Sequence, residues 1–94
     1  MAERGTIVVV DDEANIADLV ALYLDREGFR VVKAATGSDG IAAFQQHRPR
    51  LVVLDVGLPD LDGLEVCKRI RMQSQTPVIF LTARDGEIDR ILGL

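Results

Sequence analysis

Three aspartates stand directly behind two apolar runs of the sequence. Asp11 and Asp12 follow the run TIVVV, and Asp55 follows the run LVVL. If these runs are neighbouring strands of a parallel sheet, the three carboxylates meet at its carboxyl edge, where α/β proteins bind ligands. Crowded carboxylates repel one another unless one of them takes up a proton or a cation enters. Because oxygen ligands without His or Cys favour a hard ion, these residues predict an Mg²⁺ site, with Mn²⁺ as a second candidate.

Thr82 directly follows another apolar run, VIFL, and is expected to reach the same edge of the sheet. A carboxylate such as Asp55 can attack phosphorus when a metal screens the charge of the incoming group. The Thr82 hydroxyl and the Ala83 backbone amide would then donate hydrogen bonds to the phosphoryl oxygens. A purely structural interpretation stays open for each position, because Asp and Thr are also preferred helix caps.

The chain alternates between apolar runs and amphipathic stretches. β-Branched runs without strict alternation are typical of strands buried on both faces of a parallel sheet. Apolar residues at helical spacing separate these runs, with Asp62 as a predicted N-cap and with Gly28 and Pro49 as predicted stops. The predicted strands cover residues 6–10, 30–34, 51–54 and 78–81.

A fourth helix is expected to begin after Asp85 and to carry Ile88, Ile91 and Leu92 on one face. The resulting order βαβαβαβα predicts an α/β fold, in which a parallel sheet has right-handed crossovers and helices on both faces. Because the sequence has no repeats, linkers or low-complexity segments, residues 1–94 are predicted to form one domain.

Composition excludes several classes of protein. With 94 residues, 48% hydrophobic and 28% charged, the chain is too apolar for a disordered segment. No stretch approaches the roughly 20 apolar residues of a membrane span, so we expect no membrane partner. Cys67 stands alone, which excludes an internal disulfide and fits a cytoplasmic protein. The net charge of -4 argues against a nucleic-acid-binding face on this chain.

Three separated motifs carry a resemblance to a known family. The motifs are VVVDDE at residues 8–13, LDVGLPDLDG at 54–63 and FLTA at 80–83. In this order, and spread over the whole chain, they closely resemble the receiver domain of bacterial two-component response regulators. The run TARDGEIDRILGL is further similar to the subfamily whose receivers precede a winged-helix DNA-binding domain.

The resemblance implies a role for each candidate residue. Asp55 is the aspartate that a sensor histidine kinase phosphorylates, and Thr82 is the switch hydroxyl drawn towards the phosphoryl group. Asp11 and Asp12 hold Mg²⁺, with the Asp12 side chain as a direct ligand, and the backbone carbonyl of Gly57 completes the protein's share of the site. The domain is a self-phosphorylating and self-dephosphorylating signalling module and no enzyme in the usual sense. DNA would be bound only through a domain absent from this chain.

The same resemblance implies a flavodoxin-like doubly wound sheet of order 2-1-3-4-5, of which the sequence, ending at Leu94, is expected to form only 2-1-3-4. The fifth strand and helix are expected to be missing, together with the lysine that follows strand 5. Neither Lys33 nor Lys68 is placed to replace that lysine. With residues 78–81 as an exposed edge, we expect a homodimer that covers this edge and the fourth helix. It would form either by edge-to-edge pairing or by exchange of the C-terminal segment between protomers. A monomer whose fourth helix folds over the edge is the alternative.

Two other functions remain open on the residues. An aspartyl-phosphate hydrolase similar to the haloacid dehalogenases needs a second Asp two residues after the nucleophile, and Gly57 occupies that position. A truncated, non-phosphorylated interaction or assembly module is the other alternative. TGSDG, at residues 36–40, could cradle a phosphate, although a turn with an N-cap is the favoured interpretation.

Overall fold

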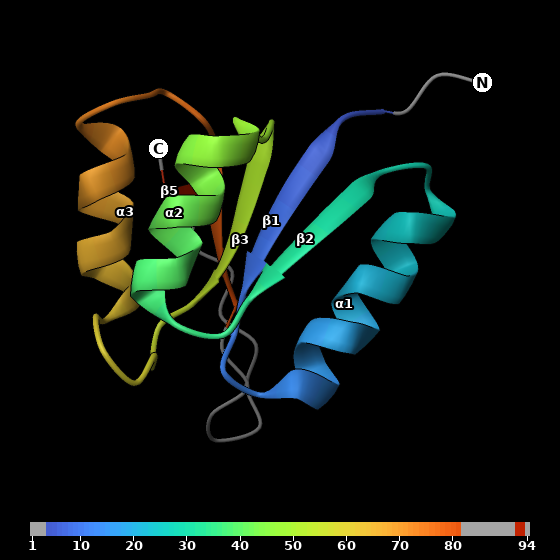
Figure 1. Ribbon diagram of the computed structural model, residues 1–94, viewed down its shortest axis with the longest axis horizontal. Helices are drawn as coiled ribbons and strands as arrows, with labels where there is room; N and C mark the ends of the chain where they lie inside the picture. The colour runs from blue at the N-terminus through green and yellow to red at the C-terminus, as the bar shows by residue number, and fades with distance from the viewer. Residues whose placement is uncertain (1–3, 82–91, 94) are drawn as a thin grey trace.

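The computed structural model describes residues 4–81 and 92–93, which form a five-stranded sheet of order β2-β1-β3-β4-β5 flanked by three helices (Figure 1). In chain order the elements are β1 (Thr6–Val10), α1 (Ala14–Arg26), β2 (Arg30–Ala34), α2 (Gly37–His47), β3 (Leu51–Asp55), α3 (Gly63–Arg71), β4 (Val78–Leu81) and β5 (Leu92–Gly93). Among these helices the longest has 13 residues, and none is long and apolar enough to cross a membrane.

The first four strands are parallel and keep a common register. Val10 at the end of β1 pairs with Ala34 of β2 and with Leu54 of β3, and Leu54 pairs in turn with Phe80 of β4. The carboxyl ends of these strands therefore lie level at one edge of the sheet. The predicted flavodoxin-like order 2-1-3-4 is confirmed, and β3 extends one residue further than predicted, to include Asp55.

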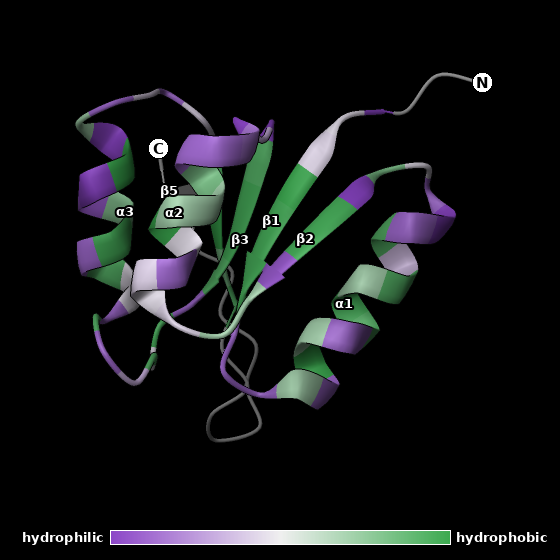
Figure 2. Cartoon of the chain, viewed as in Figure 1, coloured by the Kyte–Doolittle hydropathy of each residue, from purple (hydrophilic) through white to green (hydrophobic). Residues whose placement is uncertain are grey.

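Both faces of the sheet are buried, as the apolar runs predict. Ile7 and Val9 of β1 pack with Ala17 of α1, whereas Val8 and Val10 belong to a larger core under α2 and α3. Figure 2 shows the hydrophobic strands between helices whose outward faces are hydrophilic. Of the helices in residues 4–81, α1 thus covers one face of the sheet, and α2 and α3 cover the other.

Local signals set the helix boundaries. The Asp62 side chain accepts a hydrogen bond of 3.0 Å from the Glu65 amide and caps α3, as predicted. The chain leaves α1 through Gly28, whose φ of 93° lies in the left-handed region that favours glycine. Helix α2 ends at His47, and its C-cap Arg48, which has a φ of 46°, directly precedes Pro49.

The predictions for the end of the chain were partly wrong. Leu92, expected in a fourth helix, lies in β5 and pairs with Ile79 of β4, while Gly93 pairs with Val78. The added strand is antiparallel, so the sheet has a short fifth strand where none was expected. The physical reason is that the open edge of β4 carries backbone groups that a following extended segment can pair. Most of the predicted fourth helix, including Ile88 and Ile91, lies outside the described residues.

Candidate functional site

The three predicted aspartates meet at the carboxyl edge of the sheet. Asp11 directly follows β1 and Asp55 ends β3, and these neighbouring strands are paired at Val10 and Leu54. One carboxylate oxygen from each of Asp11, Asp12 and Asp55 lies within 4.8 Å of the other two. The strand register is therefore sufficient to bring together residues that are more than 40 positions apart in the sequence.

The environments of the three carboxylates differ. Asp11 is buried, Asp55 is half-buried and Asp12 is exposed. Burial raises the pKa of Asp11, an effect that the hydrogen bond from the Glu13 amide opposes and that the charges of Asp55 and Asp12 reinforce. The 2.9 Å bond from the Glu13 amide fixes one Asp11 oxygen beside the start of α1. Within the described part of the chain the other oxygens of the cluster accept no hydrogen bond, so they can face a cation.

A structural role as a helix cap does not explain the acidic cluster. The N-cap of α1 is Glu13, and its side chain makes no capping hydrogen bond. Among the described residues, no lysine or arginine forms an ion pair with Asp11, Asp12 or Asp55. Uncompensated carboxylates at this spacing repel each other, and a divalent cation would relieve that repulsion. The oxygen-only donor set therefore fits a hard metal ion.

The loop after β3 is held close to the cluster. The Gly63 amide donates a 2.9 Å hydrogen bond to the Val56 carbonyl, so the ends of this loop, residues 56–62, lie together. A Cβ atom on Gly63 would lie 2.6 Å from the Asp55 carbonyl oxygen, a clash with backbone that only glycine avoids. Gly57, the expected carbonyl ligand, is the second residue of this loop. Its role as a ligand stays a prediction.

The remaining predicted site residues lie beyond the described part of the chain. Thr82 and Ala83 follow Leu81, the last residue of β4, and are outside the described residues. Leu81 is the register partner of Asp55, so β4 ends level with the acidic cluster. The predicted phosphoryl contacts of Thr82 and Ala83 stay predictions.

Sequence analysis missed Asp60. Its carboxylate accepts hydrogen bonds from the Gly37 amide at 2.7 Å and the Ser38 amide at 2.9 Å, at the start of α2. These two bonds hold the pKa of Asp60 well below its usual value. The Thr36 side chain accepts from the Asp39 amide at 3.0 Å, which confirms the turn and N-cap interpretation of TGSDG. No local pattern links Asp60 to α2, because the partners are 22 and 23 residues apart.

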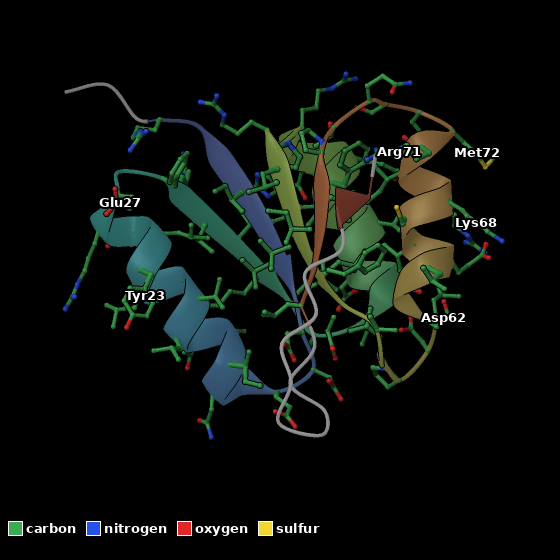
Figure 3. The ribbon with its side chains drawn as sticks, turned by 180° about the vertical axis from the view of Figure 1, so that it is seen from behind. Tyr23, Glu27, Asp62, Lys68, Arg71 and Met72 are labelled. Carbon is green, nitrogen blue, oxygen red and sulfur yellow. The ribbon has the colours of Figure 1, made fainter. Side chains whose placement is uncertain are left out.

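The two lysines, the cysteine and the histidine described in this part of the chain lie in the helices and in β2. The Lys33 ammonium pairs with Asp18 at 2.6 Å, and Lys68 projects from the outer side of α3 in Figure 3. Among the described residues neither lysine forms an ion pair with the acidic cluster, although Lys33 lines a pocket together with Asp11 and Asp12. Cys67 packs against the core beneath α3, and His47 is exposed at the end of α2.

Known proteins match both the sequence and the fold. A family model described as the response regulator receiver domain matches residues 7–94. Transcriptional regulatory protein AfsQ1 of Streptomyces coelicolor is 46% identical over 89 residues, which cover 95% of this chain and 40% of AfsQ1. The chain thus spans less than half the length of this curated relative.

Solved structures agree with this assignment. The BeF3-activated receiver domain of RstA from Klebsiella pneumoniae superposes with a TM-score of 0.80 at 35% identity, covering 85% of this chain and 68% of that one. Response regulator TrrA from Thermotoga maritima, solved in complex with Mg²⁺ and BeF, gives a TM-score of 0.80 at 37% identity, covering 85% of this chain and 70% of that one. The position of the acidic cluster, the sheet order and these similarities together lead to one assignment. The chain belongs to the response regulator receiver domain family.

Proposed function

We propose that this chain is a phosphoacceptor domain that receives a phosphoryl group from a sensor histidine kinase on Asp55, with Mg²⁺ bound beside it. The observation that carries the proposal is the meeting of Asp11, Asp12 and Asp55 within 4.8 Å at the carboxyl edge of the sheet. Family membership supports it, and so does the similarity to TrrA, which was solved in complex with both Mg²⁺ and BeF.

The chain's own residues divide the work between them. An Asp55 carboxylate oxygen attacks the phosphorus atom of the donor, the bond from phosphorus to the donor's leaving atom breaks, and an acyl phosphate forms. Asp11, the Asp12 side chain, Asp55 and the Gly57 carbonyl would hold the ion. When bound, Mg²⁺ supplies positive charge that offsets the repulsion between two anionic reactants. The Thr82 hydroxyl and the Ala83 amide would donate to the phosphoryl oxygens.

The wider role follows from the relatives. AfsQ1 is named a transcriptional regulatory protein, so we propose that this receiver controls a DNA-binding domain, of the winged-helix type, outside residues 1–94. A cytoplasmic location and a homodimeric state belong to the same proposal. No observation on the described residues favours the aspartyl-phosphate hydrolase or the non-phosphorylated assembly module.

Acetyl phosphate with Mg²⁺ tests the chemistry directly. Intact-mass and peptide mapping should find one added phosphoryl group on Asp55, labile to hydroxylamine, and Asp55→Asn should abolish it. Asp62→Asn is a matched control, because Asn caps a helix as well as Asp does and Asp62 lies outside the cluster. Phosphate on another residue, or modification that persists in Asp55→Asn, would contradict the proposal.

A further inference from the structure

Loop 56–62, which joins β3 to α3, is fastened at its middle as well as at its ends. Gly63 closes the ends through its contacts with Asp55 and Val56. Between them, both oxygens of Asp60 are used: Oδ1 accepts from the Gly37 amide and Oδ2 accepts from the Ser38 amide. An exposed side chain thus makes two charge-assisted hydrogen bonds to a different element of the fold.

The first turn of α2 depends on this contact. The first amides of a helix lack partners within the helix, and they attract negative charge. Thr36 satisfies the Asp39 amide locally, but Asp60 is the partner that satisfies the Gly37 and Ser38 amides. Because these amides are bonded by two different residues, Thr36 and Asp60, substitution of each residue can measure its effect separately.

Close packing leaves little room for the loop and α2 to separate or slide. A Cβ atom on Gly37 would lie 2.9 Å from the Leu61 Cβ, 3.0 Å from the Val66 Cγ2 and 3.2 Å from the Asp60 Oδ1. Gly37 is buried, and Leu61 packs against the core. The hydrogen bonds of Asp60 therefore join surfaces that already fit together.

Helix α2 packs against β1, the strand that directly precedes Asp11. A Cβ atom on Gly40 would lie 2.7 Å from the Val10 Cγ2, and Val10 directly precedes Asp11. A continuous set of contacts therefore runs from Asp11 through α2 and Asp60 to the loop that follows Asp55. Asp11 and Asp12 therefore lie at one end of these contacts, and Asp55 lies at the other.

We infer that Asp60 is a positioning residue for the metal site: its contact with α2 holds loop 56–62, and with it Gly57, in place relative to Asp11 and Asp12. This inference rests on the proposed function. It assigns Asp60 no contact with the ion or with the phosphoryl group. It also implies reciprocity, because a contact that favours metal binding must itself be strengthened when metal binds.

Two measurements test the inference on the unphosphorylated protein. The first is the Mg²⁺ dissociation constant, taken from the rise in denaturation midpoint across an Mg²⁺ titration. The second is amide hydrogen exchange at Gly37 and Ser38 with and without Mg²⁺. The variants are Asp60→Ala, with Thr36→Ala as a control that weakens α2 and Asp39→Asn as a control that removes one nearby charge.

Asp60→Ala should weaken Mg²⁺ binding by about tenfold, the lower end of losses seen when groups that orient metal ligands are removed. Thr36→Ala should lower the denaturation midpoint but change the Mg²⁺ dissociation constant by no more than about twofold relative to the unmodified protein. Asp39→Asn should also change this dissociation constant by no more than about twofold. In the unmodified protein Mg²⁺ should slow exchange at Gly37 and Ser38, and in Asp60→Ala this slowing should disappear. Asp60→Asn keeps one acceptor oxygen and should recover part of the affinity.

The outcomes separate two failures. If the unmodified protein binds Mg²⁺ and Asp60→Ala binds it equally well, the positioning role is wrong and the metal site stands. If Thr36→Ala weakens binding as much as Asp60→Ala does, Asp60 acts only as a helix cap and the inference is overturned. If the unmodified protein gains no stability from Mg²⁺, the proposed function fails and the inference fails with it.

Discussion

Asp12 and Asp11 make different contributions to the same site, because one is exposed and the other is buried. An exposed carboxylate keeps its hydration and can exchange a water for a metal ion at little cost. A buried carboxylate has already lost hydration on folding, so its charge is costly until a cation arrives. Asp12 is therefore the accessible ligand, and Asp11 is the buried charge that a bound cation stabilises.

Removing the exposed ligand should remove the response to metal. In the unmodified protein, free Mg²⁺ at about 100 times its dissociation constant should add about 2.7 kcal/mol to the free energy of unfolding. Asp12→Ala should lose most of this gain, as measured by urea denaturation with and without Mg²⁺. Asp25→Ala makes the same charge change on an exposed part of α1 and should keep the gain. An equal gain in Asp12→Ala would contradict the assignment of Asp12 as a ligand.

The buried residue should govern the pH dependence of the metal-free protein. Folding raises the pKa of Asp11 above 3.8, so the folded state holds this proton more tightly than the unfolded chain does. The resulting stabilisation is fully present below pH 3.8 and is lost as pH rises through the raised pKa. Asp11→Asn mimics the neutral form, and its Oδ1 can still accept from the Glu13 amide.

At neutral pH without metal, Asp11→Asn should therefore be more stable than the unmodified protein, and this difference should vanish at low pH. Urea denaturation at a series of pH values with EDTA measures it. Mg²⁺ should reverse the ranking, because a carboxylate binds the ion more strongly than a neutral amide does. A variant that is less stable than the unmodified protein at neutral pH without metal would show that the Asp11 charge is already compensated.

At the scale of elements, the start of α3 is packed against the end of β3 with no spare volume. A methyl group on Gly63 would meet the Asp55 carbonyl oxygen at 2.6 Å and the Val56 Cα at 2.9 Å. Both are backbone atoms, which cannot swing aside as a side chain can. Gly63→Ala should therefore cost about 1–3 kcal/mol of stability and weaken Mg²⁺ binding by displacing Asp55.

Leu64→Ala is the matched control for this prediction. Leu64 is the next residue of α3 and is 57% exposed, so its truncation should change stability by no more than about 0.5 kcal/mol. Denaturation midpoints with and without Mg²⁺ give both quantities for both variants. If Gly63→Ala folds and binds metal as Leu64→Ala does, the close approach of α3 to β3 does not control the site.

Most elements were predictable because their signals are local. Asp62 caps a helix through an amide only three residues away, and Gly28 ends a helix through its own backbone freedom. Two features were not predictable for the same physical reason. Asp60 bonds amides 22 and 23 residues back, and Leu92 is a strand residue because the open edge of β4 lies beside it, although its spacing from Ile88 is helical.

At the scale of the whole molecule, the sheet order turns sequence positions into a site. Asp55 meets Asp11 and Asp12 because β1 and β3 are neighbours, an adjacency that the family resemblance supplied and the residues alone did not. Once the order is given, the rest is geometry, since parallel strands in register end level. Sequence analysis therefore identified the three aspartates correctly as a cluster, whereas the Asp60 contact had to be found in the structure.

The edge of the sheet is where the assembly of the molecule can be tested. Among the described residues, only Val78 and Ile79 of β4 have partners on the side of β5, so the expected open edge is reduced to Phe80 and Leu81. The homodimer stays a prediction, and the antiparallel β4–β5 pairing offers it a route. If β5 of each protomer pairs with β4 of its partner, the same residues pair between chains and no new contact is required.

We therefore predict that the fraction of dimer in sedimentation velocity rises with protein concentration. Ile79→Lys places a charge on the half-buried centre of the β4 edge, where a lysine opposite Leu92 disfavours the β4–β5 pairing. The exchanged dimer needs this pairing, whereas a single chain can leave β5 unpaired, so the variant should shift the protein to monomer. Gln75→Lys adds the same charge at an exposed position before β4 and should leave the dimer unchanged. Circular dichroism separates dissociation from unfolding in Ile79→Lys. A protein that remains monomeric at the highest concentrations reached would show that β5 pairs only within its own chain.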